Sequence, residues 1–320
     1  MSRQQMMINY PHIAAMVFNT PLYATPEVVA SVKAVLIPRL TGQQLPDTHL
    51  DVDSAQPLDG QAMQLSDEEH EVQHMCIVGK VAVIRVHGVL VARRGTIDSA
   101  CTELISYERL RTQISAALKH ELVEEVVLDF HTGGGMAMGC MELADYIHES
   151  TNVKPITAIV NFAAYSAGYY LASACSRIIC SPTGGVGSVG VIMETFEVSK
   201  WEEEVGIKYN TFYRGGHKND CSPHEPITEQ AIAEINSRLD ISYEQFTSSV
   251  AKYRGIELQA VIDTEARLLT PEEALSIGFV DEIAPAQDAI NNIAAKHITA
   301  APPRTAIGMR AAAIDKESQL

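Results

Sequence analysis

Apolar residues recur along this chain with two alternating spacings, which predict strands and helices in turn. Val81 to Val86 and Val123 to Phe130 are apolar runs of strand length, and the second has the near-continuous apolar character of a strand covered on both faces. Between them, Tyr107 to His120 carries apolar residues at helical spacing. The pattern continues with strands expected at 156–160, 177–180, 191–193, 207–213 and 279–283, and helices expected at 26–40, 166–174 and 200–205. Strands that alternate with helices predict an α/β fold with a largely parallel sheet.

Two further helices are predicted from their end signals. Apolar residues recur at helical spacing from Ile232 to Tyr253, and Gly255 is a residue type that often ends helices. Thr270 to Glu273 reads as a capping box with proline at the first helical position, and the helix it starts is expected to stop at Gly278. The first of these is expected to be the longest helix of the chain.

Composition separates a folded part from its flanks. No lysine or arginine lies between Arg39 and Lys80, whereas eight acidic residues accumulate there, as expected for a linker with little core of its own. The chain is therefore expected to divide into an N-terminal segment at 1–40, an acidic linker at 41–75, a main folded domain at 76–300 and a flexible tail at 301–320.

Charge and cysteine content restrict the classes of function. The net charge of −16 argues against a nucleic-acid-binding surface and favours a soluble, self-repelling protein. The six cysteines are scattered without a Cys-x-x-Cys pair, which fits free thiols in a reducing compartment better than disulfides or a zinc site. We expect no cofactor and no metal.

One uncharged stretch, Pro155 to Ser176, is long enough to span a bilayer. It contains Asn161, Ser166 and Gly168, however, and it divides into a β-branched half and a half rich in alanine, glycine and tyrosine. A buried strand that runs into a buried helix explains this division better. The N-terminus also lacks a secretory pattern, so we expect no membrane anchor and a cytoplasmic location.

Ser166, between small residues at the junction of the two halves, is the candidate nucleophile. A serine hydroxyl needs a base within hydrogen-bond reach and donors for the oxyanion that forms. The glycines at 133–135 lie between an expected strand and an expected helix, where backbone N–H groups can approach a substrate carbonyl. The amide of Ala167 can supply a second donor. Taken alone, the glycine triplet is somewhat better explained as a tight turn.

The base is less certain from the residues themselves. His131 lies beside the glycines and His217 in a glycine-containing loop, but neither has an obvious orienting aspartate. Lys218 can act as a base if burial lowers its pKa, because desolvation disfavours the ammonium form. On spacing alone, a solvated loop lysine explains Lys218 better, so the three candidates stay open at this point.

Five segments in order resemble the signal peptide peptidase A family of Ser–Lys peptidases, whose fold is related to crotonase and Clp protease. These segments are Asp129 to Gly135, Ala164 to Tyr170, Thr183 to Ile192, Tyr213 to Pro223 and Thr270 to Ile283. The resemblance covers about residues 80–285. It implies repeated β-β-α units with layered sheets and flanking helices.

The resemblance also implies residue roles. Ser166 would be the nucleophile, Lys218 the general base and later the general acid, and the N–H groups of Gly134 and Ala167 the oxyanion hole. The chain departs from the family's pattern at Gly133, where proline is usual, and at His131, where a small or acidic residue is usual. A looser turn is expected as a result.

The opening of the chain, Asn9 to Leu22, resembles the start of the lambda-type phage capsid assembly proteases. This implies a serine endopeptidase that works through an acyl-enzyme on scaffold, portal or capsid proteins. It also implies a location in the host cytoplasm, within the assembling prohead. Separately, edge strands and the long apolar helix indicate self-association into a homo-oligomer, and the net charge leads us to expect no nucleic-acid partner. Three alternatives remain: a cytosolic signal-peptide-peptidase-like enzyme that degrades peptides, a crotonase-type acyl-CoA enzyme, and a non-catalytic scaffold.

Overall fold

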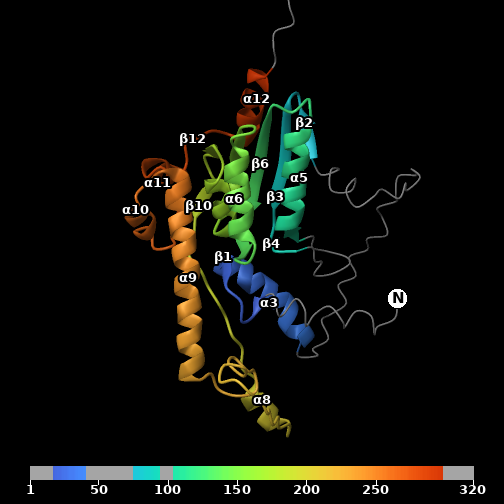
Figure 1. Ribbon diagram of the computed structural model, residues 1–320, viewed down its shortest axis with the longest axis vertical. Helices are drawn as coiled ribbons and strands as arrows, with labels where there is room; N and C mark the ends of the chain where they lie inside the picture. Colours follow the sequence, from blue (N-terminus) through green and yellow to red (C-terminus); the bar gives the residue numbers. More distant parts are fainter. Residues whose placement is uncertain (1–16, 41–74, 94–103, 298–320) are drawn as a thin grey trace, which may run out of the picture.

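The computed structural model describes residues 17–40, 75–93 and 104–297 (Figure 1). The expected acidic linker, except for its last residue, and the expected tail at 301–320 lie outside these residues. Within them, no helix is both long and apolar enough to cross a bilayer.

A large sheet forms the centre of the molecule. Its main path runs, in spatial order, through β11 (Leu268–Leu269), β10 (Gly185–Gly187), β8 (Ile156–Tyr165), β6 (Glu125–Thr132), β3 (Val81–His87) and β2 (Met75–Val78). Beside the first half of β8 lie β9 (Arg177–Cys180) and then β12 (Glu282–Ile283). Only the two ends of the main path, β2 and β11, pair antiparallel, so the expected largely parallel sheet is confirmed.

A second, four-stranded sheet packs next to the first. Its order is β1 (Leu22–Ala24), β7 (Gly134–Met136), β4 (Leu90–Val91) and β5 (Ile105–Ser106). The chain passes twice from a large-sheet strand to a small-sheet strand and then into a helix. The first such unit is β3, β4 and α5 (Tyr107–Lys119), with β5 just before the helix, and the second is β6, β7 and α6 (Cys140–Ser150). The expected β-β-α units and layered sheets are therefore confirmed.

Helices cover both faces of the large sheet. On one face α5, α6, α7 (Ala167–Ser173) and the second half of α9 (Glu229–Arg254) contribute to the main core. On the other face α12 (Ala286–Lys296) packs on β3, β6, β8 and β9 through a smaller apolar cluster. The helix α12 and the short helix α10 (Leu258–Ile262) were not expected from the sequence, whereas α11 (Pro271–Ser276) begins with the expected capping box.

Within the expected N-terminal segment at 1–40, the described residues 17–40 fold with the rest of the described chain. The strand β1 is a member of the small sheet, because it pairs antiparallel with β7. The expected helix at 26–40 is confirmed as α3 (Pro26–Leu40), which follows β1 directly. Together they form a separate apolar cluster with β4 and β7. The folded unit thus includes residues 17–40 in addition to the part expected to begin near Met75.

Residues 194–228, which include α8 (Ser199–Glu204), extend from the body of the molecule. Together with the first half of α9 they form an extension that we call the arm (Figure 1). The strand expected at 207–213 is wrong: every residue of this stretch is exposed, and Phe212 is 92% exposed. It has no sheet edge to pair with, so its apolar residues reach solvent instead of a core. The stretch expected at 191–193 forms an isolated bridge at Ile192 rather than a strand.

The apolar stripe predicted along α9 is buried over its second half. Phe246 and Val250 are fully buried in the main core, whereas Ile232, near the start of the helix, is 38% exposed. The helix ends as expected, with Gly255 in the left-handed conformation at φ 63°. One end of this helix therefore belongs to the core and the other to the arm.

Candidate active site

Ser166 lies at the sharp turn where β8 ends and α7 begins. Its backbone has φ 54° and ψ −118°, a conformation that L-residues rarely adopt and that costs about 1–3 kcal/mol. Two hydrogen bonds hold it there: Ser166 N donates to Gly187 O at 2.8 Å, and Tyr170 N donates to Ser166 O at 2.9 Å. The strand and the helix therefore impose a strained backbone at the residue that carries the hydroxyl.

The side chain of Ser166 is enclosed and unpaired. The residue is 1% exposed, and its Oγ is buried with no hydrogen-bond partner in the described structure. Leaving a buried hydroxyl unpaired costs about 1–3 kcal/mol, so such a group calls for an explanation. Strain and an unmade hydrogen bond at one serine fit a reactive group better than a structural one.

The glycine turn lies directly against this serine. A Cβ at Gly134, where φ is +102°, would be 3.0 Å from Ser166 Cβ, 3.1 Å from Ala167 N and 2.1 Å from Tyr23 O. Glycine is therefore required here both by the backbone conformation and by the close approach. The structure brings together three of the predicted site residues, Ser166, Gly134 and Ala167.

The two amides of the predicted oxyanion hole differ in their present partners. As the first residue of α7, Ala167 has an N–H that the helix itself does not use. The N–H of Gly134 instead donates to Thr132 Oγ1 at 3.0 Å, and the Thr132 hydroxyl in turn donates to Gly88 O. Thr132 thus fixes the orientation of the turn. Sequence reasoning missed this residue, although its place directly before the glycines was a signal.

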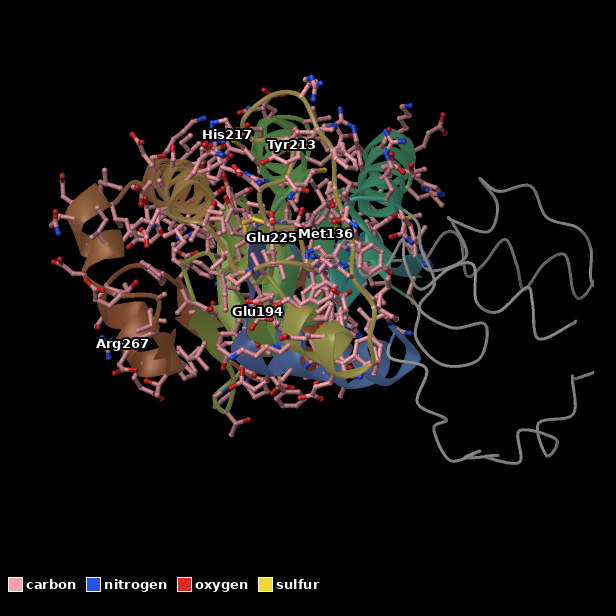
Figure 2. All side chains as sticks on the ribbon, turned by 90° about the horizontal axis from the view of Figure 1, so that it is seen from below. Met136, Glu194, Tyr213, His217, Glu225 and Arg267 are labelled. Atoms are coloured by element: carbon pink, nitrogen blue, oxygen red, sulfur yellow. The ribbon has the colours of Figure 1, made fainter. Side chains whose placement is uncertain are left out.

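Lys218 is not brought to Ser166. The expected dyad is not formed within the described chain, because Ser166 Oγ has no partner and Lys218 is exposed on the arm. Its own backbone N–H donates to Gly215 O at 3.1 Å, which closes a local turn. Figure 2, seen from below, shows its neighbours Tyr213 and His217 on this extension. The loop extends away from the sheet because residues 207–213 form no strand.

The two histidine candidates are engaged elsewhere. His131 Nδ1 lies 3.1 Å from Asn161 O, and its ring meets Phe162 edge-on at 6.2 Å. His217 Nδ1 lies 2.7 Å from Asp220 Oδ2, so an aspartate does orient this ring, contrary to expectation. The hydrogen bond from His217, followed by one from Gln230, lowers the pKa of Asp220. Neither histidine hydrogen-bonds Ser166.

Comparison with protein-family models matches residues 148–299 to Peptidase family S49. The chain is 31% identical over 289 residues to capsid assembly protease C of Escherichia phage lambda, covering 88% of this chain and 65% of that protein. It is 30% identical over 289 residues to the head-tail preconnector protein of Enterobacteria phage P21, covering 89% of this chain and 57% of that protein. The chain thus spans less than two thirds of the length of both relatives.

Weaker similarities extend to other peptidases. A protein described as signal peptide peptidase SppA from Enterococcus faecium is 27% identical over 220 residues, covering 67% of this chain and 62% of that protein. Among solved structures, a membrane-bound stomatin-specific protease overlaps with a TM-score of 0.42 at 18% identity, over 68% of this chain and 85% of its own. A ClpP1 from Listeria monocytogenes overlaps with a TM-score of 0.40 at 14% identity, over 65% and 94%. The fold assignment rests on the strand order described above.

Proposed function

Because residues 148–299 carry a peptidase family S49 domain, we propose that this chain is a serine endopeptidase whose nucleophile is Ser166. The observation that carries the proposal is the strained, buried and unpaired hydroxyl of Ser166, held against Gly134 and the amide of Ala167. An activated serine requires a position of this kind, with donors beside it for the charge that develops.

The reaction follows from these positions. Ser166 Oγ attacks the scissile carbonyl carbon and loses its proton to a base, while the carbonyl oxygen becomes an oxyanion. The N–H of Ala167 stabilises that oxyanion. The N–H of Gly134, which donates to Thr132 Oγ1 in this structure, joins it once that hydrogen bond is released. The C–N bond breaks, the base returns the proton to the leaving amine, and water then hydrolyses the acyl ester on Ser166 by the same route.

The base in this proposal is Lys218 of a second copy. Lysine is a base only when neutral, and burial favours the neutral form. Within one chain Lys218 is exposed, as are four aromatic side chains of the arm, Trp201, Tyr209, Phe212 and Tyr213, by 46–92%. Exposed aromatic groups in such number mark a protein–protein interface. A homo-oligomer in which one copy's arm covers the next copy's Ser166 would bury both the aromatic groups and the lysine.

The substrates in this proposal are proteins of an assembling phage head, cleaved in the host cytoplasm. Supporting this are the name and the 31% identity of capsid assembly protease C of phage lambda. The alternative, a peptidase of the same chemistry that degrades peptides, is supported by the similarity to SppA. Co-expression with the capsid, portal and scaffold proteins encoded beside the chain separates the two, because only the first predicts discrete fragments of those proteins.

The dyad is tested by two inactive variants and their mixture. Ser166→Ala and Lys218→Ala should each reduce cleavage by about 10³-fold or more, because each removes a group on which the chemistry depends. Lys208→Ala, on the same arm and equally exposed, is the matched control and should keep its activity. Fragments are measured by mass spectrometry after co-expression with substrate.

Co-expression of the two inactive variants then tests whether the dyad forms between copies. Mixed oligomers contain sites with both an intact serine and an intact lysine, so cleavage should return. No recovery from a mixture that still forms oligomers would place both residues in one chain. Full activity of Lys218→Ala alone would remove the lysine from the mechanism.

A further inference from the structure

The strand β1 lies in a groove that its own chain fills completely. On one side it pairs antiparallel with β7, and the pairing continues through Thr25 N, which donates to Gly133 O at 3.0 Å. On the other side Leu22 exchanges two hydrogen bonds with Ile192, at 2.8 and 3.0 Å, and Asn19 N donates to Glu194 O at 2.9 Å. An extended segment is thus held between two backbone edges, one from the glycine turn and one from the start of the arm.

This segment passes directly over the nucleophile. The Cβ position of Gly134 is 2.1 Å from Tyr23 O and 3.0 Å from Ser166 Cβ, so the carbonyl of Tyr23 and the candidate nucleophile flank the same point. Ala167 N lies 3.1 Å from that point. A backbone carbonyl of the chain itself is therefore the group that lies next to the serine and its amide donor.

The side chain of Tyr23 fills a buried pocket between α7 and α9. It is 2% exposed and packs against Phe246 of α9 at 4.7 Å and Tyr170 of α7 at 5.6 Å between ring centroids. Its hydroxyl donates to Ser242 O at 2.8 Å. Burial raises the pKa of Tyr23 well above its ordinary value, so the hydroxyl stays a donor. The pocket accepts a large aromatic side chain and satisfies its polar end.

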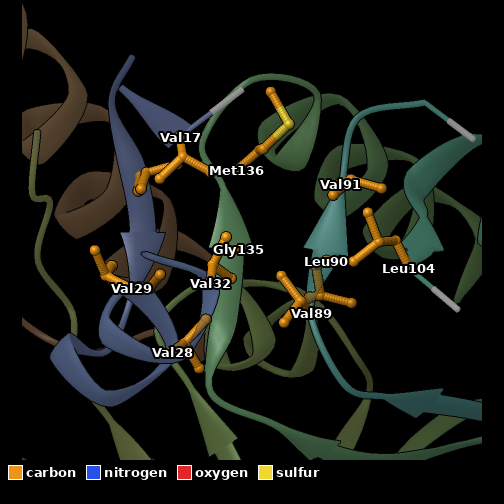
Figure 3. A pocket seen from close by; sticks show the side chains of 12 residues that line it. Val17, Val28, Val29, Val32, Val89, Leu90, Val91, Leu104, Gly135 and Met136 are labelled. Atoms are coloured by element: carbon orange, nitrogen blue, oxygen red, sulfur yellow. The ribbon is translucent and has the colours of Figure 1, made fainter. Parts of the chain in front are cut away.

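The packing behind β1 is less complete than that of the main core. Figure 3 looks into an apolar cavity of about 40 Å³ between α3, β7 and β4, lined among others by Val28, Val29, Leu90 and Met136. The side chains that line this cavity lack packing partners on one side, which weakens the packing behind β1. Apart from Tyr23, whose ring belongs to the main core, β1 and α3 pack in their own small cluster, so the Tyr23 ring is the main side-chain attachment of β1 to that core.

From these observations we propose that residues 18–25 occupy the groove in which a substrate segment is bound. We further propose that the pocket of Tyr23 selects an aromatic residue in the substrate. The inference rests on the proposed function, since it needs Ser166 to act on peptide bonds. A peptide that adds to a sheet edge needs free backbone groups, and those of β7 and of residues 192–194 are taken by β1. The chain therefore competes with its own substrates at a high effective concentration.

The first test does not depend on catalysis. In full-length Ser166→Cys protein, alkylation of the introduced thiol by iodoacetamide is followed by peptide mapping, which separates it from the native cysteines. Adding Tyr23→Ala empties the pocket and should increase the alkylation rate by at least about tenfold, because β1 loses its main side-chain anchor. Tyr23→Phe keeps the ring contacts and should react as slowly as the parent. Equal rates in all three proteins would overturn the proposal.

A reversible disulfide lock between β1 and β7 provides a second test, which remains available if Tyr23→Ala does not fold. Leu22 and Met136 are direct cross-strand partners in the register. Because the neighbouring pairs carry the backbone hydrogen bonds, Leu22 and Met136 form a non-hydrogen-bonded pair. The spacing of such a pair suits a disulfide. Leu22→Cys with Met136→Cys should be inactive when oxidised and regain at least about tenfold activity on reduction. Leu22→Cys alone should not respond to oxidant. A locked protein that cleaves as fast as the reduced one would overturn the proposal.

The two proposals can fail separately. If alkylation is faster in Tyr23→Ala but no protein cleaves any substrate, the strand still covers Ser166 and the proteolytic function is wrong. If substrates are cleaved but the lock has no effect, the function stands and β1 is a structural strand. Fragments cut without preference for aromatic residues would overturn the assignment of the pocket.

Discussion

The surroundings of Ser166 and the arm that carries Lys218 are opposite in character. Ser166 is 1% exposed and held by backbone hydrogen bonds on both sides, and Gly134 lies so near that a Cβ added there would be 3.0 Å from Ser166 Cβ. Lys218 is exposed on a loop whose neighbour Phe212 is 92% exposed. One region is shaped completely by the fold of the single chain, and the other lacks the burial that its chemistry requires. In the proposed mechanism, the fold of the single chain forms one half of the site, and the other half requires assembly.

Glycine substitutions should separate the two regions most strongly. Gly134→Ala places a Cβ 2.1 Å from a backbone oxygen at a φ of +102°, so we expect a loss of activity of at least about 100-fold and a clear loss of stability. Gly215→Ala, in the arm, has a φ of +89° but no atom within 4 Å of the added Cβ. It should cost only the strain of its backbone, about 1 kcal/mol. Cleavage rates and chemical unfolding measure both.

Equal effects of these two substitutions would break the comparison. They would mean that the turn at Gly134 tolerates rearrangement, and that the half of the site formed by the single chain is less fixed than its contacts indicate.

Truncation of aromatic side chains should distinguish the two regions by its effects on the free energy of unfolding and on self-association. Phe246→Ala removes a ring that is fully buried against Tyr23 and Tyr170, and should lower the free energy of unfolding by about 3–5 kcal/mol. Phe212→Ala should change it by no more than about 0.5 kcal/mol but weaken self-association, because its ring is exposed in one chain. Urea unfolding and sedimentation distinguish these outcomes. A strongly destabilised Phe212→Ala would show that the arm is part of the monomer's core.

The smallest effect concerns pH. Hydrogen bonds to Glu125 and then to Glu124, at 2.8 and 3.0 Å, raise the pKa of His297 just after α12. A raised folded-state pKa stabilises the fold below the ordinary histidine pKa of about 6.5, and this contribution is lost as pH rises through the raised value. His297→Gln should therefore melt earlier than wild type at about pH 6 and approach it at about pH 8.

His217→Gln is the matched variant on the arm. Its partner Asp220 lies in the exposed loop that carries Lys218, so its melting curve should run parallel to that of wild type across the same pH range. A pH-dependent shift in this variant and none in His297→Gln would reverse the comparison.

The parts of the fold that could be predicted are those in which apolar residues or end signals recur at a regular spacing. Apolar spacing located β3, α5, β6 and α7, and the Thr270 side chain and its partner Glu273 form the capping box that their spacing indicated. The three residues of β7 include two glycines and carry no period, so neither that strand nor its pairing with β1 could be seen. The exposed stretch at 207–213 had the pattern of a strand, but a strand also needs an edge to pair with.

The candidate site likewise contains residues whose positions could be predicted and residues whose positions could not. Ser166, Gly134 and Ala167 come together because two strand ends of one sheet place them, which the order of segments implied. Lys218 was expected beside them, yet a loop that leaves the body has its position set by other contacts. Tyr23 was missed because nothing in its neighbourhood of the sequence refers to a serine 143 positions later.

The helix α9 links the two regions as a single rod. Its 26 residues correspond to about 39 Å at 1.5 Å per residue. The first half is part of the arm, and the second half packs Phe246 against Tyr170 and Tyr23. A continuous helix tilts more readily than it bends, so a displacement of its first half also moves its second half. A neighbouring molecule that displaces the first half of α9 would shift the second half, where the ring of Phe246 forms one wall of the Tyr23 pocket.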